Sequence, residues 1–264
     1  MSRQLPFALL TATMLVICSS SGFAKTPFEA SEQLTASGHI TEARRALESE
    51  LRLRPDHVEA RYNLALLLQR INQPEDAAAL YRENLSIHWH LPSLINLASL
   101  LQQQGQRAEA RSWLLKGTAH FRHEAPPWYM LAAMAEQEGH IHQAEQLLAR
   151  SISADPLNGF AHLRLADFQS RHKRSDRGIK EANRSVALLP HCAPCWQLHG
   201  NILRAAGQHR EAILSYQKSL SIRPDTEVRR QLILSLDQIG EHRRAARMQQ
   251  ALDAWMRYQN PSPP

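Results

Sequence analysis

The sequence predicts an all-α solenoid of about seven helix-turn-helix units, and two observations lead to this prediction. First, a small turn residue recurs at intervals of 33 or 34 residues, and alanine follows each one five positions later. The turn residues are Gly38, Asn72, Gly105, Gly139, Gly207 and Gly240, with Lys173 in the one longer gap. Second, the segments between the turns carry apolar residues at helical spacing and show no strand-like alternation. Such a sustained period is typical of a helical repeat array, which favours binding over catalysis.

Residues 1–24 have the pattern of a secretory signal peptide rather than that of a folded unit. Arg3 gives a positive start, an apolar run extends from Phe7 to Cys18, and Gly22 and Ala24 are small residues at −3 and −1. We therefore expect cleavage after Ala24 and a mature protein that is periplasmic or secreted. An uncleaved membrane anchor is the alternative, but the run is short against the ~20 apolar residues that span a bilayer.

Cys18 raises a second alternative, because bacterial lipoprotein signals also end at a cysteine. A lipidated Cys18 would hold the protein at a membrane. The preceding residue, Ile17, is larger than that pattern usually has, so the sequence favours cleavage after Ala24 over lipidation.

The charge balance of the chain argues against nucleic-acid binding. The formal net charge is +6, from 31 Lys and Arg against 25 Asp and Glu. Basic and acidic residues are interspersed, except in a basic run from Arg171 to Arg184. Such a balance indicates an acidic partner or solubility. The basic run is interpreted as a solvated face, with an anionic partner or a lipid headgroup as the alternative.

Each predicted unit is a pair of amphipathic helices, and a proline tends to close it. The units span residues 25–57, 58–90, 91–124, 125–158, 159–192, 193–225 and 226–257, followed by a tail at 258–264. Proline cannot continue a helix, so the chain breaks between units at Pro55, Pro156, Pro190 and Pro224.

Local chemistry supports the helices within these units. In the second unit, Asn72 suits a left-handed turn and Pro74 suits the first turn of the next helix. Ala77 is small because the two helices are expected to cross there. The fifth unit departs from the pattern, since it has Lys173 and Gly178 where other units have glycine and alanine. The last helix also drifts from the pattern and is expected to cap the array.

The sixth unit carries the clearest resemblance to a known family. Its motif residues are Trp196, His199, Gly200, Leu203, Gly207, Ala212, Tyr216, Ser219 and Pro224. Their types and spacing resemble the tetratricopeptide repeat family, and the fourth unit matches with Trp128, Leu131, Ala132, Gly139, Ala144, Leu148 and Pro156. The resemblance covers about residues 25–257. It implies a right-handed superhelix with a C-terminal capping helix, in which the first helix of each unit lines a concave groove.

The resemblance further implies that this groove holds a peptide segment or a helix of a partner protein. The positions that it marks for partner binding are Tyr62, Asn63, Gln69, Asn96, Tyr129, Arg164, Asn201 and Arg204, with Leu66 and Arg70 on the same face. Amide side chains suit an extended peptide, whose backbone needs hydrogen-bond partners. Asn63, Asn96 and Arg164 share one motif position, but the lysines that some family members use to hold a C-terminal carboxylate are missing. The alternative is that these three residues cap or solvate their helices.

The segment from His191 to Trp196 contains a Cys-x-x-Cys pair, Cys192 and Cys195. Helix amides stabilise a thiolate in such a pair at a helix start, which is typical of redox motifs. Those motifs follow a strand in thioredoxin-like proteins, and no strand is expected here. In an oxidising compartment the favoured interpretation is a structural disulfide. A redox centre, or a metal site that uses nearby histidines, remains as the alternative.

No catalytic, cofactor-binding or metal-binding residues are predicted, because the sequence has no phosphate-binding loop, nucleophile elbow or spaced carboxylate pair. The chain is therefore expected to be no enzyme but an exported scaffold. It would bind a protein or peptide partner and support assembly of an envelope complex, without nucleic acid or a small-molecule substrate. One alternative is a thiol–disulfide or cytochrome-assembly helper that uses the cysteine pair. The other is a lipoprotein pilot for a secretion or pilus system.

Overall fold

The computed structural model describes residues 26–259. The predictions for residues 1–24, including cleavage after Ala24 and lipidation of Cys18, lie outside the described residues. Residues 26–259 form fourteen α-helices and no strand, and none of these helices is both long and apolar enough to cross a membrane. Their bounds are α1 Pro27–Ala36, α2 Ile40–Leu53, α3 Val58–Arg70, α4 Pro74–Ile87, α5 Leu91–Gln103, α6 Arg107–His120, α7 Ala125–Gln137, α8 Ile141–Ala154, α9 Gly159–Arg171, α10 Ser175–Leu188, α11 Ala193–Ala205, α12 His209–Ile222, α13 Thr226–Gln238 and α14 His242–Gln259.

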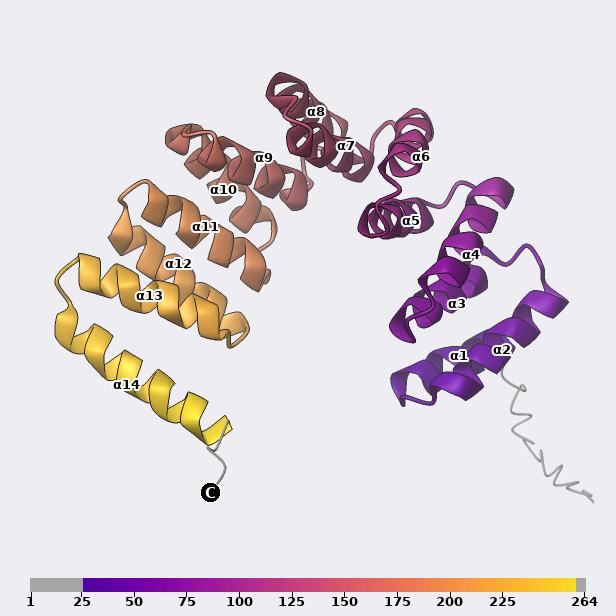
Figure 1. Cartoon of the computed structure of the whole chain (residues 1–264), viewed down its shortest axis with the longest axis horizontal. Helices are drawn as coiled ribbons and strands as arrows, with labels where there is room; N and C mark the ends of the chain where they lie inside the picture. Colours follow the sequence, from indigo (N-terminus) through magenta and orange to yellow (C-terminus); the bar gives the residue numbers. More distant parts are fainter. Residues whose placement is uncertain (1–25, 260–264) are drawn as a thin grey trace, which may run out of the picture.

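The helices pack in chain order into an open arch (Figure 1). α1 to α4 form one arm, α11 to α14 form the other, and α7 and α8 lie at the crown. Each helix packs mainly against the helices before and after it, with further contacts between alternate helices such as α9 and α11. The buried core is accordingly a row of clusters along the arch rather than a single centre. This arrangement confirms the predicted all-α repeat solenoid.

The period of the sequence reflects a backbone requirement at the turn inside each unit. Asn72 at φ 60° and Lys173 at φ 59° are left-handed, and so are five glycines at φ 76° to 82°. These glycines are Gly38, Gly105, Gly139, Gly207 and Gly240. Most side chains are strained in the left-handed region, so glycine is the residue that best fits these turns. In the fifth unit Lys173 holds a β-carbon in that region and therefore carries a backbone cost.

The alanine that follows each turn lies where the two helices of a unit cross. Five of these alanines are fully buried, namely Ala43, Ala77, Ala110, Ala144 and Ala212. Their burial agrees with the predicted close crossing. In the fifth unit a β-carbon on Gly178 would lie only 3.1 Å from the carbonyl oxygen of Ala166. Glycine therefore replaces alanine there for a steric reason.

The prolines that close three of the units also accept a hydrogen bond from the next unit. The donor is the side chain six residues later, near the start of the following helix. Arg61 Nη2 donates to the carbonyl of Pro55, His162 Nε2 lies 3.1 Å from that of Pro156, and Trp196 Nε1 donates to that of Pro190 at 3.0 Å. Three chemically different side chains thus make the same link between units.

Candidate partner-binding groove

The predicted partner-binding residues all lie on first helices of units. Tyr62, Asn63 and Gln69 lie on α3, Asn96 on α5, Tyr129 on α7, Arg164 on α9, and Asn201 and Arg204 on α11. Arg164 is exposed and the other seven are half-buried. The structure brings Tyr62 together with Asn96 and Tyr129 together with Arg164.

On the N-terminal arm, the buried Tyr81 of α4 joins the groove residues of two neighbouring units. Its hydroxyl donates to Gln69 Oε1 at 2.6 Å. Asn96 Nδ2 lies 3.2 Å from the hydroxyl oxygen of Tyr62 and 3.3 Å from that of Tyr81. Burial raises the pKa of Tyr81, so its hydroxyl stays a donor. Both amides therefore brace α3, α4 and α5, and each keeps one polar atom, Gln69 Nε2 or Asn96 Oδ1, outside these bonds.

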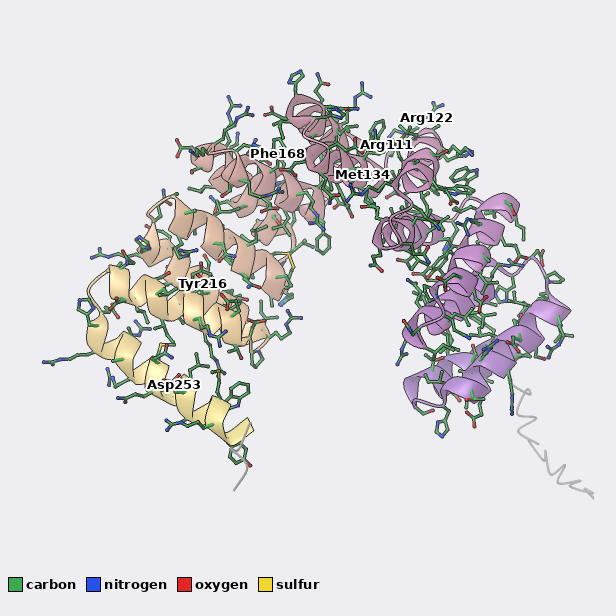
Figure 2. The ribbon with its side chains drawn as sticks, in the orientation of Figure 1. Arg111, Arg122, Met134, Phe168, Tyr216 and Asp253 are labelled. Atoms are coloured by element: carbon green, nitrogen blue, oxygen red, sulfur yellow. A yellow bond between two sulfur atoms is a disulfide. The ribbon has the colours of Figure 1, made fainter. Side chains whose placement is uncertain are left out.

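Tyr216 occupies the equivalent position on the C-terminal arm, where its hydroxyl bonds to a groove amide of its own unit (Figure 2). It is fully buried on α12, and its hydroxyl donates to Asn201 Oδ1 on α11 at 2.8 Å. Gly200 leaves room for the ring, because a β-carbon there would lie 2.6 Å from it. Burial raises the pKa of Tyr216, against the opposing effect of the Arg204 guanidinium. Arg204 Nε is itself buried and has no hydrogen-bond partner among the described residues.

Closer to the crown, Tyr129 and Arg164 bring an aromatic ring and a positive charge together. The Arg164 guanidinium lies 6.0 Å from the centre of the Tyr129 ring, at the limit of a cation–π contact. Burial raises the pKa of Tyr129, against the opposing charge of Arg164. Because Arg164 is exposed, its charge is accessible to an acidic group of a ligand.

A pocket of about 490 Å³ opens between α1 and α3. It is lined by Ser31, Glu32, Thr35 and Ala36 of α1 and by Asn63, Leu66, Leu67 and Arg70 of α3. Leu66 and Leu67 supply apolar surface, while Glu32 and Arg70 supply opposite charges. No site residue on α1 was predicted from the sequence. The register set by Gly38 is the signal that would have pointed to that helix, because it places Glu32 in the position that Leu66 has in the second unit.

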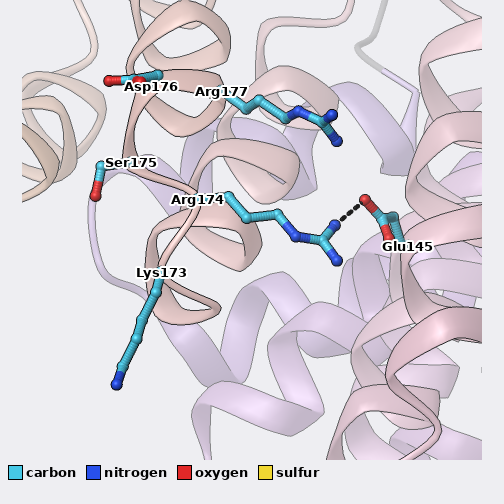
Figure 3. Close-up of a pocket in the computed structure, with 6 residues that line it drawn as sticks. All are labelled: Glu145, Lys173, Arg174, Ser175, Asp176 and Arg177. Carbon is cyan, nitrogen blue, oxygen red and sulfur yellow. Dashed lines mark hydrogen bonds and ion pairs between the residues drawn. The ribbon is translucent and has the colours of Figure 1, made fainter.

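Acidic side chains from the preceding unit partly neutralise the basic run that begins at Arg171. Arg171 Nη1 lies 2.6 Å from Glu136 Oε1, and Arg174 pairs with Glu145 beside a shallow hollow of about 760 Å³ (Figure 3). The hydrogen bond from Arg174 holds the pKa of Glu145 below its ordinary value. These pairs leave fewer free charges for an anionic partner, in keeping with a solvated face.

Cys192 and Cys195 form a disulfide at the N-terminus of α11, with Cα atoms 5.2 Å apart. Cys192 is the residue that caps the helix and is half-buried, whereas Cys195 in the first turn is fully buried. The N–H of Cys195 donates to Cys192 Sγ at 3.2 Å. No group of three or more His, Cys, Asp and Glu side chains suited to a metal ion occurs in the described part of the chain. The disulfide is the bond that the sequence analysis favours, and its role remains a prediction.

Comparison with known proteins assigns the fold. Three family models described as tetratricopeptide repeat match residues 33–89, 93–117 and 193–226. A tetratricopeptide repeat protein from Parabacteroides merdae ATCC 43184 is similar in structure, with a TM-score of 0.59 and 18% sequence identity over 86% of this chain and 91% of that chain. The fold is a tetratricopeptide repeat solenoid. No curated protein matches the sequence.

Two further structures share this tetratricopeptide repeat architecture. A chain of the APC/C hetero-tetramer Cut9–Hcn1 has a TM-score of 0.62 at 18% identity, over 80% of this chain and 42% of that chain. MamA from Desulfovibrio magneticus RS-1 has a TM-score of 0.55 at 19% identity, over 69% of this chain and 97% of that chain. The present chain thus spans less than half of the length of the Cut9–Hcn1 chain. At these identities the likeness establishes the fold alone.

The tetratricopeptide repeat register accounts for what the sequence analysis found and missed at the groove. It marks the first-helix positions, and all eight predicted residues lie on those helices. It marks Tyr216 as a core position of the second helix, and the ring is buried. The register does not predict that the hydroxyl groups of Tyr81 and Tyr216 donate hydrogen bonds to groove amides. Those bonds depend on the distance between the two helices of a unit.

Proposed function

We propose that this chain is an exported scaffold that binds a segment of a partner protein in its concave groove and so supports assembly of an envelope complex. The observation that carries the proposal is the pocket between α1 and α3, which includes the predicted Asn63 and combines apolar surface with two opposite charges. Solenoids of stacked repeats use extended concave surfaces to bind their partners, which supports this role. The signal-peptide pattern of residues 1–24 supports the exported part of the proposal.

The pocket suits an apolar side chain on a peptide or on a partner helix. Its volume of about 490 Å³ lies within the range of about 300–1,000 Å³ that is usual for ligand pockets. An apolar anchor would contact Leu66 and Leu67, while the Asn63 amide pairs with the backbone beside it. Arg70 and Glu32 would select charges of opposite sign on the flanking residues, which fixes the direction of the bound segment.

The hydrogen bonds beneath the groove favour binding by holding polar groups in place. Tyr81 fixes the Gln69 amide and Tyr216 fixes the Asn201 amide before any ligand arrives. A side chain that is already ordered loses little further entropy on association, so more of the interaction energy appears as affinity. The same bonds make Asn96 a poor probe of binding. Its replacement by alanine would also remove contacts to Tyr62 and Tyr81.

Site-specific photo-crosslinking tests the proposal. A photoreactive residue at position 66 should capture a partner from an envelope extract, whereas one at Leu115 should not. Leu115 is the matched control because it is an exposed leucine on α6, the second helix of a unit. Equal capture from both positions, or none from position 66, would contradict groove binding.

Once a partner is captured, substitutions at the pocket give the energetic test. Asn63→Ala combined with Arg70→Ala should weaken binding of the purified partner at least tenfold, which corresponds to a loss of about 1.4 kcal/mol. The control Arg210→Ala removes an exposed arginine from α12 and should leave affinity unchanged. Normal binding by the double variant would show that the partner is held elsewhere.

A further inference from the structure

We propose that Cys192 and Cys195 form a thiol–disulfide exchange site that oxidises a pair of thiols in another polypeptide. This activity goes beyond groove binding and does not depend on it. The loop that carries the disulfide has counterparts between other units that carry none.

The fold sets the shape of the Cys192 loop without a covalent bond. In four loops the residue that caps the next helix donates its N–H to the carbonyl three residues earlier, at 3.1 Å in each case. The pairs are Cys192 with Leu189, Asn158 with Asp155, His57 with Arg54, and Glu124 with Phe121. Cys192 and Asn158 also share one backbone conformation, with φ −91° and ψ 97° at Cys192 against −77° and 98° at Asn158. The loop at residues 155–158 has no cysteine, so this conformation does not require a disulfide.

The disulfide also adds little as a structural constraint. It joins residues only three positions apart, and the loop-closure entropy that a disulfide removes from the unfolded chain is smallest for short loops. The sulfur of Cys192 accepts the capping hydrogen bond of α11, whereas in α9 an oxygen has this role. There Asn158 Oδ1 accepts the N–H of Ala161 at 3.1 Å. Sulfur is a weaker acceptor than oxygen, so capping alone does not account for a cysteine here.

The two sulfur atoms lie in different surroundings, as an exchange reaction requires. Cys195 is fully buried, whereas Cys192 is partly exposed, so an incoming thiolate meets Cys192 first. Cys192 is also the sulfur that receives the N–H of Cys195 at the start of a thirteen-residue helix. Helix amides at this position stabilise a thiolate on Cys192. A stabilised thiolate favours the reduced pair, which makes the disulfide an oxidant of other thiols.

The reaction balances with the disulfide as the oxidant and a dithiol polypeptide as the reductant. A thiolate of the partner, whose proton goes to water, attacks Cys192 Sγ. The bond between Cys192 and Cys195 breaks, and Cys195 leaves and takes up the proton of the partner's second thiol. That second thiolate attacks the partner sulfur in the mixed disulfide, and Cys192 leaves as a thiolate at the α11 N-terminus. Two electrons pass to the cysteine pair, and the partner gains one disulfide.

A synthetic peptide with two reduced cysteines is the probe for this reaction. The full chain is used with Cys18→Ser, because the sequence contains three cysteines and only two of them belong to the pair. Mixed without oxygen at pH 7, the oxidised protein should convert the peptide to its disulfide, with up to one peptide oxidised per chain. A peptide that stays reduced, beside a pair that stays oxidised, would overturn the proposal.

Single variants test the separate roles of the two sulfurs. Cys195→Ala mixed with the disulfide-linked dimer of a single-cysteine peptide should retain a mixed disulfide through Cys192, and Cys192→Ala should form none. At pH 6 an ordinary thiol with a pKa of ~8.5 is almost fully protonated. Folded Cys195→Ala should nevertheless be alkylated at least tenfold faster at pH 6 than the same protein in urea. Equal rates in the folded and unfolded protein would overturn the assigned role of the helix terminus.

The double variant separates exchange from a structural role. Cys192→Ala with Cys195→Ala should keep its helical circular dichroism and a thermal midpoint close to that of the parent chain. A large fall in that midpoint would show that the bond holds the fold, and it would overturn the inference drawn from the equivalent loops.

Discussion

Lys173 is the residue at which a single substitution is expected to stabilise the chain. Its φ of 59° lies in the left-handed region, where five equivalent turns have glycine. Left-handed backbone costs an L-residue roughly 1–2 kcal/mol, and the added freedom of glycine in the unfolded chain offsets part of the gain. Lys173→Gly should therefore raise the free energy of unfolding by about 0.5–1 kcal/mol in urea titrations. Lys173→Ala keeps the strained β-carbon and serves as the control. No gain for Lys173→Gly over Lys173→Ala would contradict strain at this turn.

Ala144 tests the packing between the two helices of the fourth unit. It is fully buried on α8, so a leucine there would force the crossing helices apart. Ala144→Leu should lower the free energy of unfolding by ~1–3 kcal/mol. Ala149→Leu is the control, since Ala149 is an exposed alanine of the same helix and its change should fall within ~0.5 kcal/mol. Equal urea midpoints for the two variants would show that the helices do not cross closely at Ala144.

Ion pairs in or next to the second helices link consecutive units. Arg82 of α4 binds Glu109 of α6, with Nε 2.8 Å from Oε1, and Arg174 pairs with Glu145 of α8. In both cases the hydrogen bond from arginine holds the pKa of the glutamate below its ordinary value, although partial burial opposes it. The arginine belongs to the earlier unit in the first pair and to the later unit in the second. An arginine can therefore link its unit either to the following unit or to the preceding one.

These two carboxylates predict a loss of stability in acid. Their pKa is lower in the folded chain than in the unfolded one, so their contribution is present above the ordinary glutamate pKa of ~4.3. It is lost as the pH falls through the depressed folded values. Urea midpoints should accordingly fall from pH 5 toward pH 3.

Glu109→Gln provides the matched test of this pH dependence. It should cost up to about 1 kcal/mol at pH 7, the usual limit for a partly exposed pair, and should make the acid loss shallower. Glu42→Gln, at an exposed position on α2, is the control. Parallel pH profiles for Glu109→Gln and the parent chain would exclude this pair as a cause.

The second helices also show where inference from the sequence stops. Tyr81 and Tyr216 occupy equivalent repeat positions, and their burial follows from the motif. Their hydroxyl groups reach Gln69 and Asn201 because a Tyr side chain in α4 or α12 extends across the contact with the preceding helix. That reach depends on the helix spacing, which a residue pattern does not contain. Gln69 and Asn201 were predicted to bind a partner, and the structure adds that each of them accepts a bond from within the chain.

Across the whole molecule, the fold follows from the sequence because one left-handed backbone position recurs. A left-handed turn admits few residue types, so glycine or asparagine marks it wherever it occurs, with Lys173 as the departure. The small residues at helix crossings mark the packing in the same way. By contrast, the residues of α1 and α3 that line the pocket are not restricted to one residue type by a turn or a helix crossing. The turns and the crossings can therefore be predicted from the sequence, and the pocket cannot.

Export of the chain is tested at its N-terminus. Cleavage after Ala24 predicts that the mature protein begins with Lys-Thr-Pro-Phe, which N-terminal sequencing of the periplasmic or secreted fraction would read. Replacing Ala24 by a bulky residue should block this cleavage, because the −1 position requires a small side chain. Mass spectrometry that finds a diacylglycerol group on Cys18 would instead support a lipoprotein.

Contacts that run mainly between helices adjacent in the chain make this molecule a line rather than a sphere, and a line opens most easily at its ends. Opening α1 or α14 breaks contacts on one side, whereas opening a helix at the crown breaks contacts on both. Amide hydrogen exchange should therefore be graded along the arch, fastest in α1 and α14 and slowest near α7 and α8. The pocket between α1 and α3 lies at the fast end, so a ligand bound there should slow exchange in α1 more than anywhere else.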